Sequence, residues 1–412
     1  MKRTMLTCAI SIGLLLGANA QNKSIDFKHE GTFSDRLAEA GKSKKLIFLD
    51  AYTSWCVPCK VLAKEVFTVD SIADFFNANF INVHYDMEKG EGLELKKRYE
   101  SDITAYPTLL FINDKGEIVH KIVGAPSAKN FMELSRPALN PALSLKGLAQ
   151  KFEAGDRSVS TVTAYFKTLG NSNDAEKSKA VATTYFDALP TTDLKKGDVW
   201  ALMSKYLFNT ESKSFKYVLG HRTELNKAHG EEQVNTYILN VLGREVGGLS
   251  LAYYGRKPVD AEKEEWLIKT LGTIHNDKAA TEVLKMKLIS SRNKGDWDTF
   301  NKVMVEMITS AKPISYVGAK ASMLLNFTRK FTASAPEDHL KDGVSWVDLL
   351  LKTDVTPPVA VDLLYFKKAI LSKQGKADDV QSVDKQIVFQ QKLKTEAEQR
   401  GESFPMSIKG FL

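Results

Sequence analysis

The chain has 412 residues, of which 43% are hydrophobic and 26% are charged, and its 57 basic and 50 acidic residues give a formal net charge of +7. This length exceeds one typical domain, so we expect two or three domains in an ordinary soluble globular protein. The small positive excess does not indicate nucleic acid as a partner, because a solvated surface of mixed charge has the same composition.

The first twenty residues have the three parts of a secretory signal. Lys2 and Arg3 form a basic start, residues 5–16 form an apolar segment, and residues 18–20 form a small-residue cleavage site. We therefore expect a signal peptide over residues 1–20 and an exported, for example periplasmic, mature protein. No later apolar run reaches the ~20 residues that span a bilayer, so no stable membrane insertion is expected.

The cysteines indicate chemistry instead of structural cross-linking. Cys8 lies inside the signal, which leaves Cys56 and Cys59 as the two cysteines of the mature chain. Small exported domains that depend on disulfides carry many cysteines, and an exported chain of this size with one CxxC pair is not of that kind. The pair is therefore a candidate reactive site.

Residues 26–140 alternate between strand and helix patterns. This region predicts a mixed sheet covered by helices on both faces, as one domain over residues 21–140. The last two strands are separated by a turn signal at residues 113–116 and are predicted to form a hairpin. The expected helices cover residues 32–40, 57–67, 70–76, 92–99 and 127–139, and the expected strands cover residues 46–51, 80–85, 108–112 and 117–123.

The pattern changes after residue 140. From there to the end, apolar residues recur at helical spacing, as in the series Val162, Tyr165, Phe166 and Leu169. Helix-stop signals containing glycine recur at residues 152–156, 293–296 and 372–376. We expect an all-α domain of stacked helix hairpins over residues 141–412. No convincing period supports a regular repeat array, which remains only an open possibility.

The CxxC pair lies between a strand-like run at residues 45–50 and a helix-like run at residues 61–67. If Cys56 begins the helix, the free N–H groups of the first turn favour its thiolate. Cys59 then lies close enough to form a disulfide with it, so one thiol attacks a substrate and the other resolves the mixed disulfide. Trp55 would form an apolar wall beside the sulfur.

A metal site is the alternative use of two neighbouring cysteines. Zinc needs four ligands, and the chain has no second CxxC and no suitably paired histidines near the first. We therefore expect neither a metal nor another cofactor.

Residues 45–124 resemble the thioredoxin family. The resemblance rests on three segments, Trp55–Lys60, Glu65–Phe67 and Tyr106–Phe111. They are most similar to the bacterial exported branch, which includes the C-terminal thioredoxin-like domain of the transporter that carries reducing electrons into the periplasm. The resemblance covers about a quarter of the chain and does not extend to the helical part.

The resemblance implies a role for five residues. Cys56 matches the nucleophile, and Cys59 matches the resolving thiol and should be buried behind a more exposed Cys56. Pro107 matches a proline held in the cis form, which would turn the backbone of Tyr106 toward the sulfurs to pair with a substrate. Asp50 matches a buried acid whose pKa is raised by burial, so that it can take the proton of Cys59.

Two positions depart from the family pattern. Asn82 lies where thioredoxins often have a lysine near the buried acid, which puts a lysine-assisted proton path in doubt. Tyr106 is bulkier than the usual residue before the proline and could narrow the substrate groove.

The expected function is that of an exported thiol–disulfide oxidoreductase acting on protein disulfides or dithiols, with a thiol electron donor. Val57 and Pro58 place no charge between the cysteines, which favours a reductase or isomerase over an oxidant. The helical domain is expected to bind a partner protein. The alternatives are a dithiol oxidant, and a helical adaptor whose thioredoxin domain is vestigial or regulatory.

Overall fold

The structure is a computed structural model that describes residues 23–254, 259–310, 317–328, 331–353, 355–402 and 404. The signal peptide predicted over residues 1–20 lies outside the described residues. The chain divides into two compact units, Met1–Leu189 and Pro190–Leu412, which are described separately. Within the described ranges, none of the helices combines the length and the apolar character needed to cross a bilayer.

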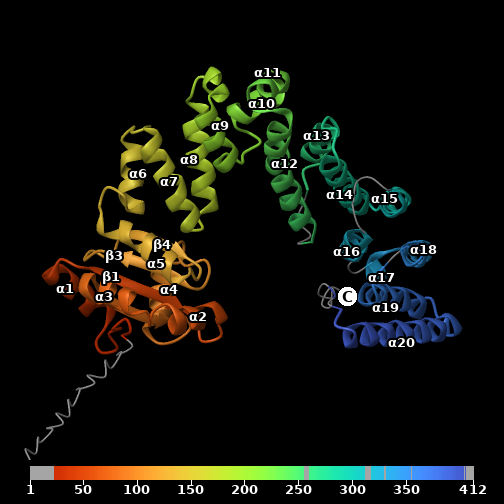
Figure 1. The fold of residues 1–412 in the computed structure, drawn as a ribbon, viewed down its shortest axis with the longest axis horizontal. Coiled ribbons are helices and arrows are strands. Elements are labelled where there is room, and N and C mark those ends of the chain that lie inside the picture. The colour runs from red at the N-terminus through yellow and green to blue at the C-terminus, as the bar shows by residue number, and fades with distance from the viewer. Residues whose placement is uncertain are drawn as a thin grey trace, which may run out of the picture. The chain divides into compact units, whose positions relative to one another are not determined.

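The first unit is built around a four-stranded sheet with the strand order β2-β1-β3-β4 (Figure 1). The central strand β1 pairs with β2 in parallel and with β3 in an antiparallel arrangement, and β3 pairs with β4 as an antiparallel hairpin. The predicted mixed sheet and its terminal hairpin are therefore confirmed. The strands are β1 (Leu46–Tyr52), β2 (Phe80–Asp86), β3 (Thr108–Ile112) and β4 (Ile118–Val123).

Helices cover both faces of this sheet. Because successive strand residues point to opposite faces, β1 supplies Phe48 to one core cluster and Ile47 and Leu49 to the other. The Phe48 cluster includes side chains of α2 (Val57–Glu65), α3 (Asp70–Asn79) and α5 (Ala128–Ser135). The other cluster includes side chains of α1 (Phe33–Ser43) and α4 (Glu91–Arg98).

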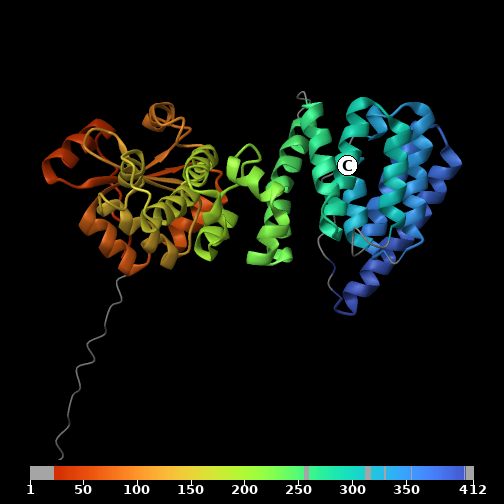
Figure 2. The same ribbon diagram turned by 90° about the horizontal axis from the view of Figure 1, so that it is seen from above.

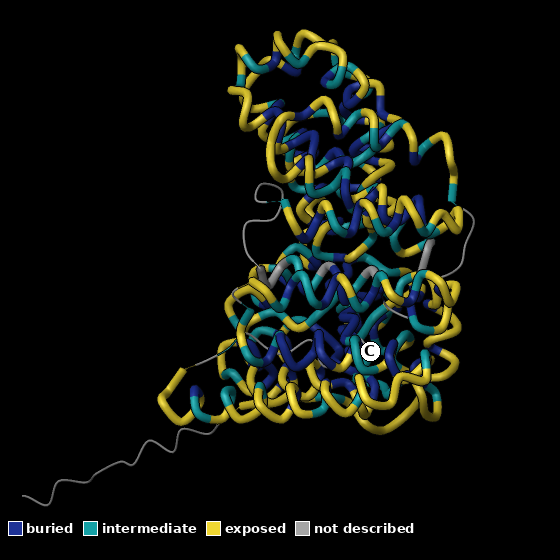
Figure 3. Tube along the Cα trace, turned by 90° about the vertical axis from the view of Figure 1, so that its right-hand side faces the viewer, coloured by how far each residue is buried: buried dark blue, intermediate teal, exposed yellow. Residues whose placement is uncertain are grey.

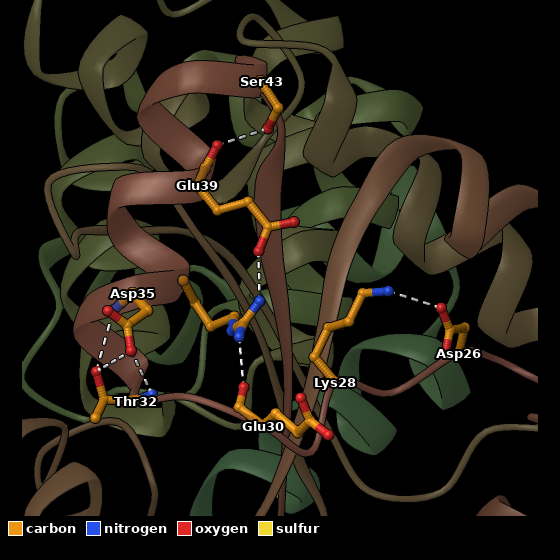
Figure 4. Close-up of polar contacts among 8 residues, drawn as sticks. Asp26, Lys28, Glu30, Thr32, Asp35, Glu39 and Ser43 are labelled. Carbon is orange, nitrogen blue, oxygen red and sulfur yellow. Dashed lines mark hydrogen bonds and ion pairs between the residues drawn. The ribbon is translucent and has the colours of Figure 1, made fainter.

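The helix starts in this unit were partly predictable. Thr32 begins α1 with a capping box, because its side chain accepts from the Asp35 N–H while the Asp35 carboxylate accepts from the Thr32 N–H (Figure 4). Asp70, a residue type that often caps a helix, is instead the first residue of α3, and Val69 precedes it without a side-chain cap. The Asp70 carboxylate accepts from the Lys23 N–H instead.

The first unit continues beyond the residue where the sequence pattern changes. After the 3-10 turn η1 (Arg136–Leu139), the helix α6 (Leu145–Glu153) packs against β4. Two further helices, α7 (Val159–Asn171) and α8 (Ala175–Asp187), follow it and pack in sequence order. Separate folding of residues 141–412 therefore stays a prediction, since helices from that range share a compact unit with the sheet.

His120 of β4 joins the sheet to α6. Its side chain is buried, with Nε2 2.9 Å from the Leu134 carbonyl and Nδ1 3.2 Å from the Leu145 N–H. These contacts require a neutral ring that donates from Nε2 and accepts at Nδ1. Burial lowers the pKa of His120 to about 4, so the ring stays neutral at physiological pH.

We predict that His120 makes folding acid-sensitive. Its pKa falls from about 6.5 in the unfolded chain to about 4 in the fold, so the unfolded state binds more protons between these values. The stabilising contribution is complete above pH 6.5 and is lost as the pH falls toward 4, by up to about 3 kcal/mol. Urea unfolding across this range should show a smaller loss in His120→Gln than in the native chain. An equal pH dependence in the two proteins would contradict the prediction.

The second unit consists of helices, and neighbours in sequence pack against each other, as in α13 with α14 and α19 with α20. Figure 2 shows several of them running side by side, and in Figure 3 their buried residues lie where helices meet. The elements are η2 (Thr191–Lys195), α9 (Gly197–Tyr206), α10 (Lys213–Gly220), α11 (Arg222–His229), α12 (Glu231–Tyr254), α13 (Ala261–Gly272), α14 (Asp277–Lys294), α15 (Trp297–Thr309), α16 (Val317–Phe327), α17 (Phe331–Ser334), η3 (Glu337–His339), α18 (Leu340–Leu351), α19 (Pro357–Lys373) and α20 (Ala377–Gln399).

The predicted helical stripes and glycine stops are confirmed. The apolar series on α7 is buried, and the glycines of the three breaks, Gly155, Gly295 and Gly375, have φ of +94°, +69° and +69°. A residue with a side chain rarely adopts this conformation, which is why glycine follows each helix end. Helix hairpins that stack in sequence order are therefore the architecture of the helical region.

Candidate active site

The two cysteines lie where β1 leads into α2. Cys56 is the residue before the helix, in an extended conformation, and its Sγ accepts a hydrogen bond from the Cys59 N–H at 3.1 Å. Pro58 occupies the first turn, where a missing N–H removes no helical hydrogen bond. The sulfur of Cys56 therefore faces the positive end of the helix dipole, as the sequence predicted.

Cys56 and Cys59 form a disulfide, with their Cα atoms 5.3 Å apart. Both residues are buried in this oxidised form, with exposed fractions of 3% for Cys56 and 5% for Cys59. The expectation that Cys56 is the more exposed thiol concerns the reduced form and stays a prediction. The disulfide can form because the first turn of α2 brings the two cysteines, which are three positions apart in the sequence, close together.

Exposed apolar side chains surround the buried disulfide. Trp55 and Val57, which flank Cys56, are 62% and 67% exposed. The Trp55 indole N–H donates to the Glu88 carboxylate at 3.0 Å, and its ring meets Tyr106 edge to face at 6.1 Å. These two contacts hold the Trp55 ring in place, and its role as an apolar wall beside the sulfur stays a prediction. No pattern in the sequence singled out Glu88 as a partner of Trp55.

The Tyr106–Pro107 peptide bond is cis, which confirms the prediction for this bond. Pro107 is buried at the start of β3, and its carbonyl accepts a hydrogen bond from the Gly124 N–H at 2.9 Å. Gly124 has a φ of +96°, which glycine adopts at no steric cost. Sequence analysis missed this residue, although a glycine directly after the last strand was the available signal.

Asp50 is a buried acid on β1, 4% exposed and six residues before Cys56. Its Oδ1 has no hydrogen-bond partner among the described residues. Burial raises the pKa of Asp50 to about 7, and no cation offsets that effect. An acid that titrates near neutral pH is suited to accept and return a proton, which is the property expected of the predicted base.

Asn82 does not replace the missing lysine. It is buried on β2, where it is the register partner of Phe48, and its amide donates to the Asn77 Oδ1 at 3.0 Å. The residue of β2 directly opposite Asp50 is His84, which sequence analysis did not single out. Strand register, which sequence pattern alone does not fix here, was needed to find it.

The described residues contain no group of three or more His, Cys, Asp or Glu side chains placed to hold a metal ion.

We predict that Asp50 destabilises the fold at high pH. Its pKa is about 7 when folded against about 3.8 when unfolded, so the folded state binds the additional proton between these values. Stability is therefore lost as the pH rises from 4 to 7. Asp50→Asn should raise the free energy of unfolding by up to about 4 kcal/mol at pH 8 and hardly change it at pH 4. Urea unfolding at both pH values tests this, and an equal change at the two would contradict it.

Comparison with known proteins gives matches to the first unit. Residues 33–137 match the family described as the thioredoxin-like domain. Thioredoxin H1 of Arabidopsis thaliana is 36% identical over 96 residues, which cover 23% of this chain and 75% of that protein. Thioredoxin H5 of the same plant is 32% identical over 93 residues, which cover 23% and 71% of the two chains.

Bacterial proteins also match. The thiol:disulfide interchange protein DsbD of Vibrio cholerae is 28% identical over 118 residues, which cover 27% of this chain and 20% of that protein. The solution structure of a disulphide-isomerase candidate from Bacteroides thetaiotaomicron is 45% identical and covers 29% of this chain and 98% of its own, with a TM-score of 0.27. The chain belongs to the thioredoxin family through these residues and is a thioredoxin-like thiol–disulfide oxidoreductase.

Proposed function

We propose that the chain is an exported enzyme that reduces or isomerises disulfides of other proteins through Cys56 and Cys59. The observation that supports this most is the disulfide at the start of α2, where the Cys56 Sγ accepts a hydrogen bond from the Cys59 N–H, together with the cis bond before Pro107. The name of the DsbD relative, a thiol:disulfide interchange protein, agrees with this chemistry.

The proposed reaction starts from the dithiol form. The Cys56 thiolate attacks one sulfur of a substrate disulfide and releases the other as a thiolate, which takes a proton from water. Cys59 then loses its proton to Asp50 and attacks the Cys56 sulfur, which forms the Cys56–Cys59 disulfide and releases the second substrate sulfur as a thiolate that takes a proton from water. A thiol electron donor returns the dithiol by the reverse exchange.

The direction of electron flow follows from the residues between the cysteines. A strong oxidant needs a strongly stabilised thiolate in its reduced form. Val57 and Pro58 carry no charge, and Pro58 removes one N–H from the first turn. The thiolate is therefore stabilised only by the helix terminus, which favours the reducing direction.

The surface around the disulfide suits a protein substrate. Trp55 and Val57 are exposed, and Tyr106 is half-buried beside them. An extended segment with an apolar residue next to its cysteine could cover this surface while it pairs with the backbone at Tyr106. Trp55, Tyr106 and Pro107 are thus the proposed substrate-binding residues.

The helical region is proposed to bind a partner protein. On α20, the neighbouring residues Val388 and Phe389 are 66% and 57% exposed, which is unusual for two adjacent large apolar side chains. Stacked helix hairpins often present such faces to proteins. The alternative, an adaptor with a vestigial thioredoxin domain, is disfavoured because the disulfide, Trp55 and the cis-proline are all retained.

We predict that insulin reduction by dithiothreitol is accelerated by this chain and that Cys56→Ser abolishes the acceleration, because the attacking thiolate is gone. Cys59→Ser should stop turnover and leave a mixed disulfide on Cys56. Turbidity reports reduction, and mass spectrometry reports the mixed disulfide.

Equilibration with glutathione buffers gives the reduction potential of the Cys56–Cys59 pair and thereby tests the direction of electron flow. A reducing couple lies below about −200 mV, whereas a value of about −120 mV would identify an oxidant.

In the insulin assay, full activity of Cys56→Ser would overturn the assignment of Cys56 as the nucleophile.

We also predict that a Cys59→Ala chain traps fewer partners when Val388 and Phe389 are both changed to Asp, because two charges would disrupt an apolar contact. Insulin reduction by the corresponding double variant with intact cysteines should match that of the native chain. An unchanged set of trapped proteins would mean that this face of α20 does not contribute to partner choice.

A further inference from the structure

His84 lies opposite Asp50 in the parallel pairing of β1 with β2. Register partners of neighbouring strands point to the same face of a sheet, and their strands lie about 4.8 Å apart in the hydrogen-bonding direction. Phe48 and Phe80 belong to the core cluster on one face, and Asp50 and His84 follow them at even spacing on their strands. The imidazole and the buried carboxyl therefore share one face of the sheet.

A series of rings extends from this position toward solvent. The Tyr52 ring lies 5.4 Å from the His84 ring, and the Phe27 ring stacks on the His84 ring at 4.8 Å. The ring of His29 meets that of His84 edge to face at 5.2 Å. His84 is half-buried and His29 is exposed, so the two histidines connect the interior with the surface.

Backbone contacts hold His29 in this place. The Lys28 N–H donates to the Asn82 carbonyl at 2.9 Å, which aligns the segment before α1 with β2. The Lys28 ammonium forms an ion pair with the Asp26 carboxylate at 2.8 Å (Figure 4).

The proposed function creates a need for a proton path. When Asp50 accepts the proton of Cys59, the acid must release that proton before the next turnover. Its carboxyl is buried, its Oδ1 has no described partner, and Asn82 supplies no charge on β2. A titratable group between Asp50 and solvent would remove this obstacle.

We propose that His84 carries the proton between Asp50 and solvent, with His29 as its outer neighbour. The inference rests on the function proposed above and adds a positioning residue to the same site. In the resolving step, the Cys59 proton moves to the Asp50 carboxylate while the sulfur forms its bond to Cys56. The Asp50 proton then moves to the neutral His84 ring, directly or through a water, and His84 releases it to His29 or to bulk water.

The surroundings of His84 favour a ring that is neutral and ready to accept. Burial, followed by the nearby His29, lowers the pKa of His84 below its usual value of 6.5. The rings of Tyr52 and His29 contact the His84 ring, and Asp50 is its register partner on β1. The neighbouring elements also carry Asp86 and Lys89, which form an ion pair after His84, and Asp26 and Lys28, which form an ion pair before α1.

The test follows the two thiol steps separately. The reduced full-length chain is mixed, in excess, with 5,5′-dithiobis(2-nitrobenzoate), and release of the coloured thiolate is followed by stopped flow. The first phase reports attack by Cys56, and the second reports attack by Cys59 on the mixed disulfide. The variants are His84→Gln, Asp50→Asn, the double variant, and His221→Gln as a control for an exposed histidine of the second unit.

We expect His84→Gln to leave the first phase unchanged and to slow the second phase roughly ten-fold near pH 7, which is modest for loss of a proton-transfer group. Added imidazole should restore much of that rate, whereas the native chain and His221→Gln should not respond. In the Asp50→Asn background, His84→Gln should cause no further slowing, because the proton that it would carry is absent.

Two results would overturn the proposal. One is a second phase in His84→Gln with the native rate and pH profile. The other is a second phase in His84→Gln that is slowed, is not restored by imidazole and is slowed further when His84→Gln is combined with Asp50→Asn. That result would show a purely structural role for His84. Loss of the first phase in the native chain would instead refute the proposed role of Cys56, so the two failures are distinguishable.

Discussion

The burial of Asp50 is the constraint on which the site depends. A carboxyl on the central strand, surrounded by core residues and without a cation, resists ionisation near neutral pH. A fold selected only for stability would have an apolar residue here, because the ionised form is disfavoured by several kcal/mol. Its presence in the centre of β1, six residues before Cys56, therefore supports the role in proton transfer that is proposed for it.

The strand that carries this acid also organises the rest of the first unit. β1 is central in the sheet and contributes Phe48 to one core cluster and Ile47 and Leu49 to the other. The same strand leads directly into α2, so the packing that fixes β1 also fixes the position of Cys56 at the helix start. Core packing and reactivity are thus coupled through one short segment, and a change that moved β1 would move the acid and the sulfurs together.

The sequence was sufficient for features encoded locally. The strand expected over residues 46–51 and the glycine stops each follow from a few neighbouring residues, and each is confirmed. The CxxC pair and the proline before β3 are also local signals. Features that depend on how distant segments pair were not accessible. His84 becomes visible only through the register of β1 with β2, Gly124 through its bond to Pro107, and Glu88 through its bond to Trp55.

The packing of α6 against the sheet of the first unit also depends on contacts between distant segments, which is why sequence analysis did not find it. The helical pattern after residue 140 correctly indicated helices, yet it gave no sign that the first of them packs on the edge strand β4. His120 makes that contact specific, because its two ring nitrogens are satisfied by groups from two different helices, near the end of α5 and the start of α6. An edge strand that is covered by a helix is protected from pairing with other chains. The helices that follow the sheet thus contribute to the thioredoxin-like unit itself, before any role in recruiting a partner.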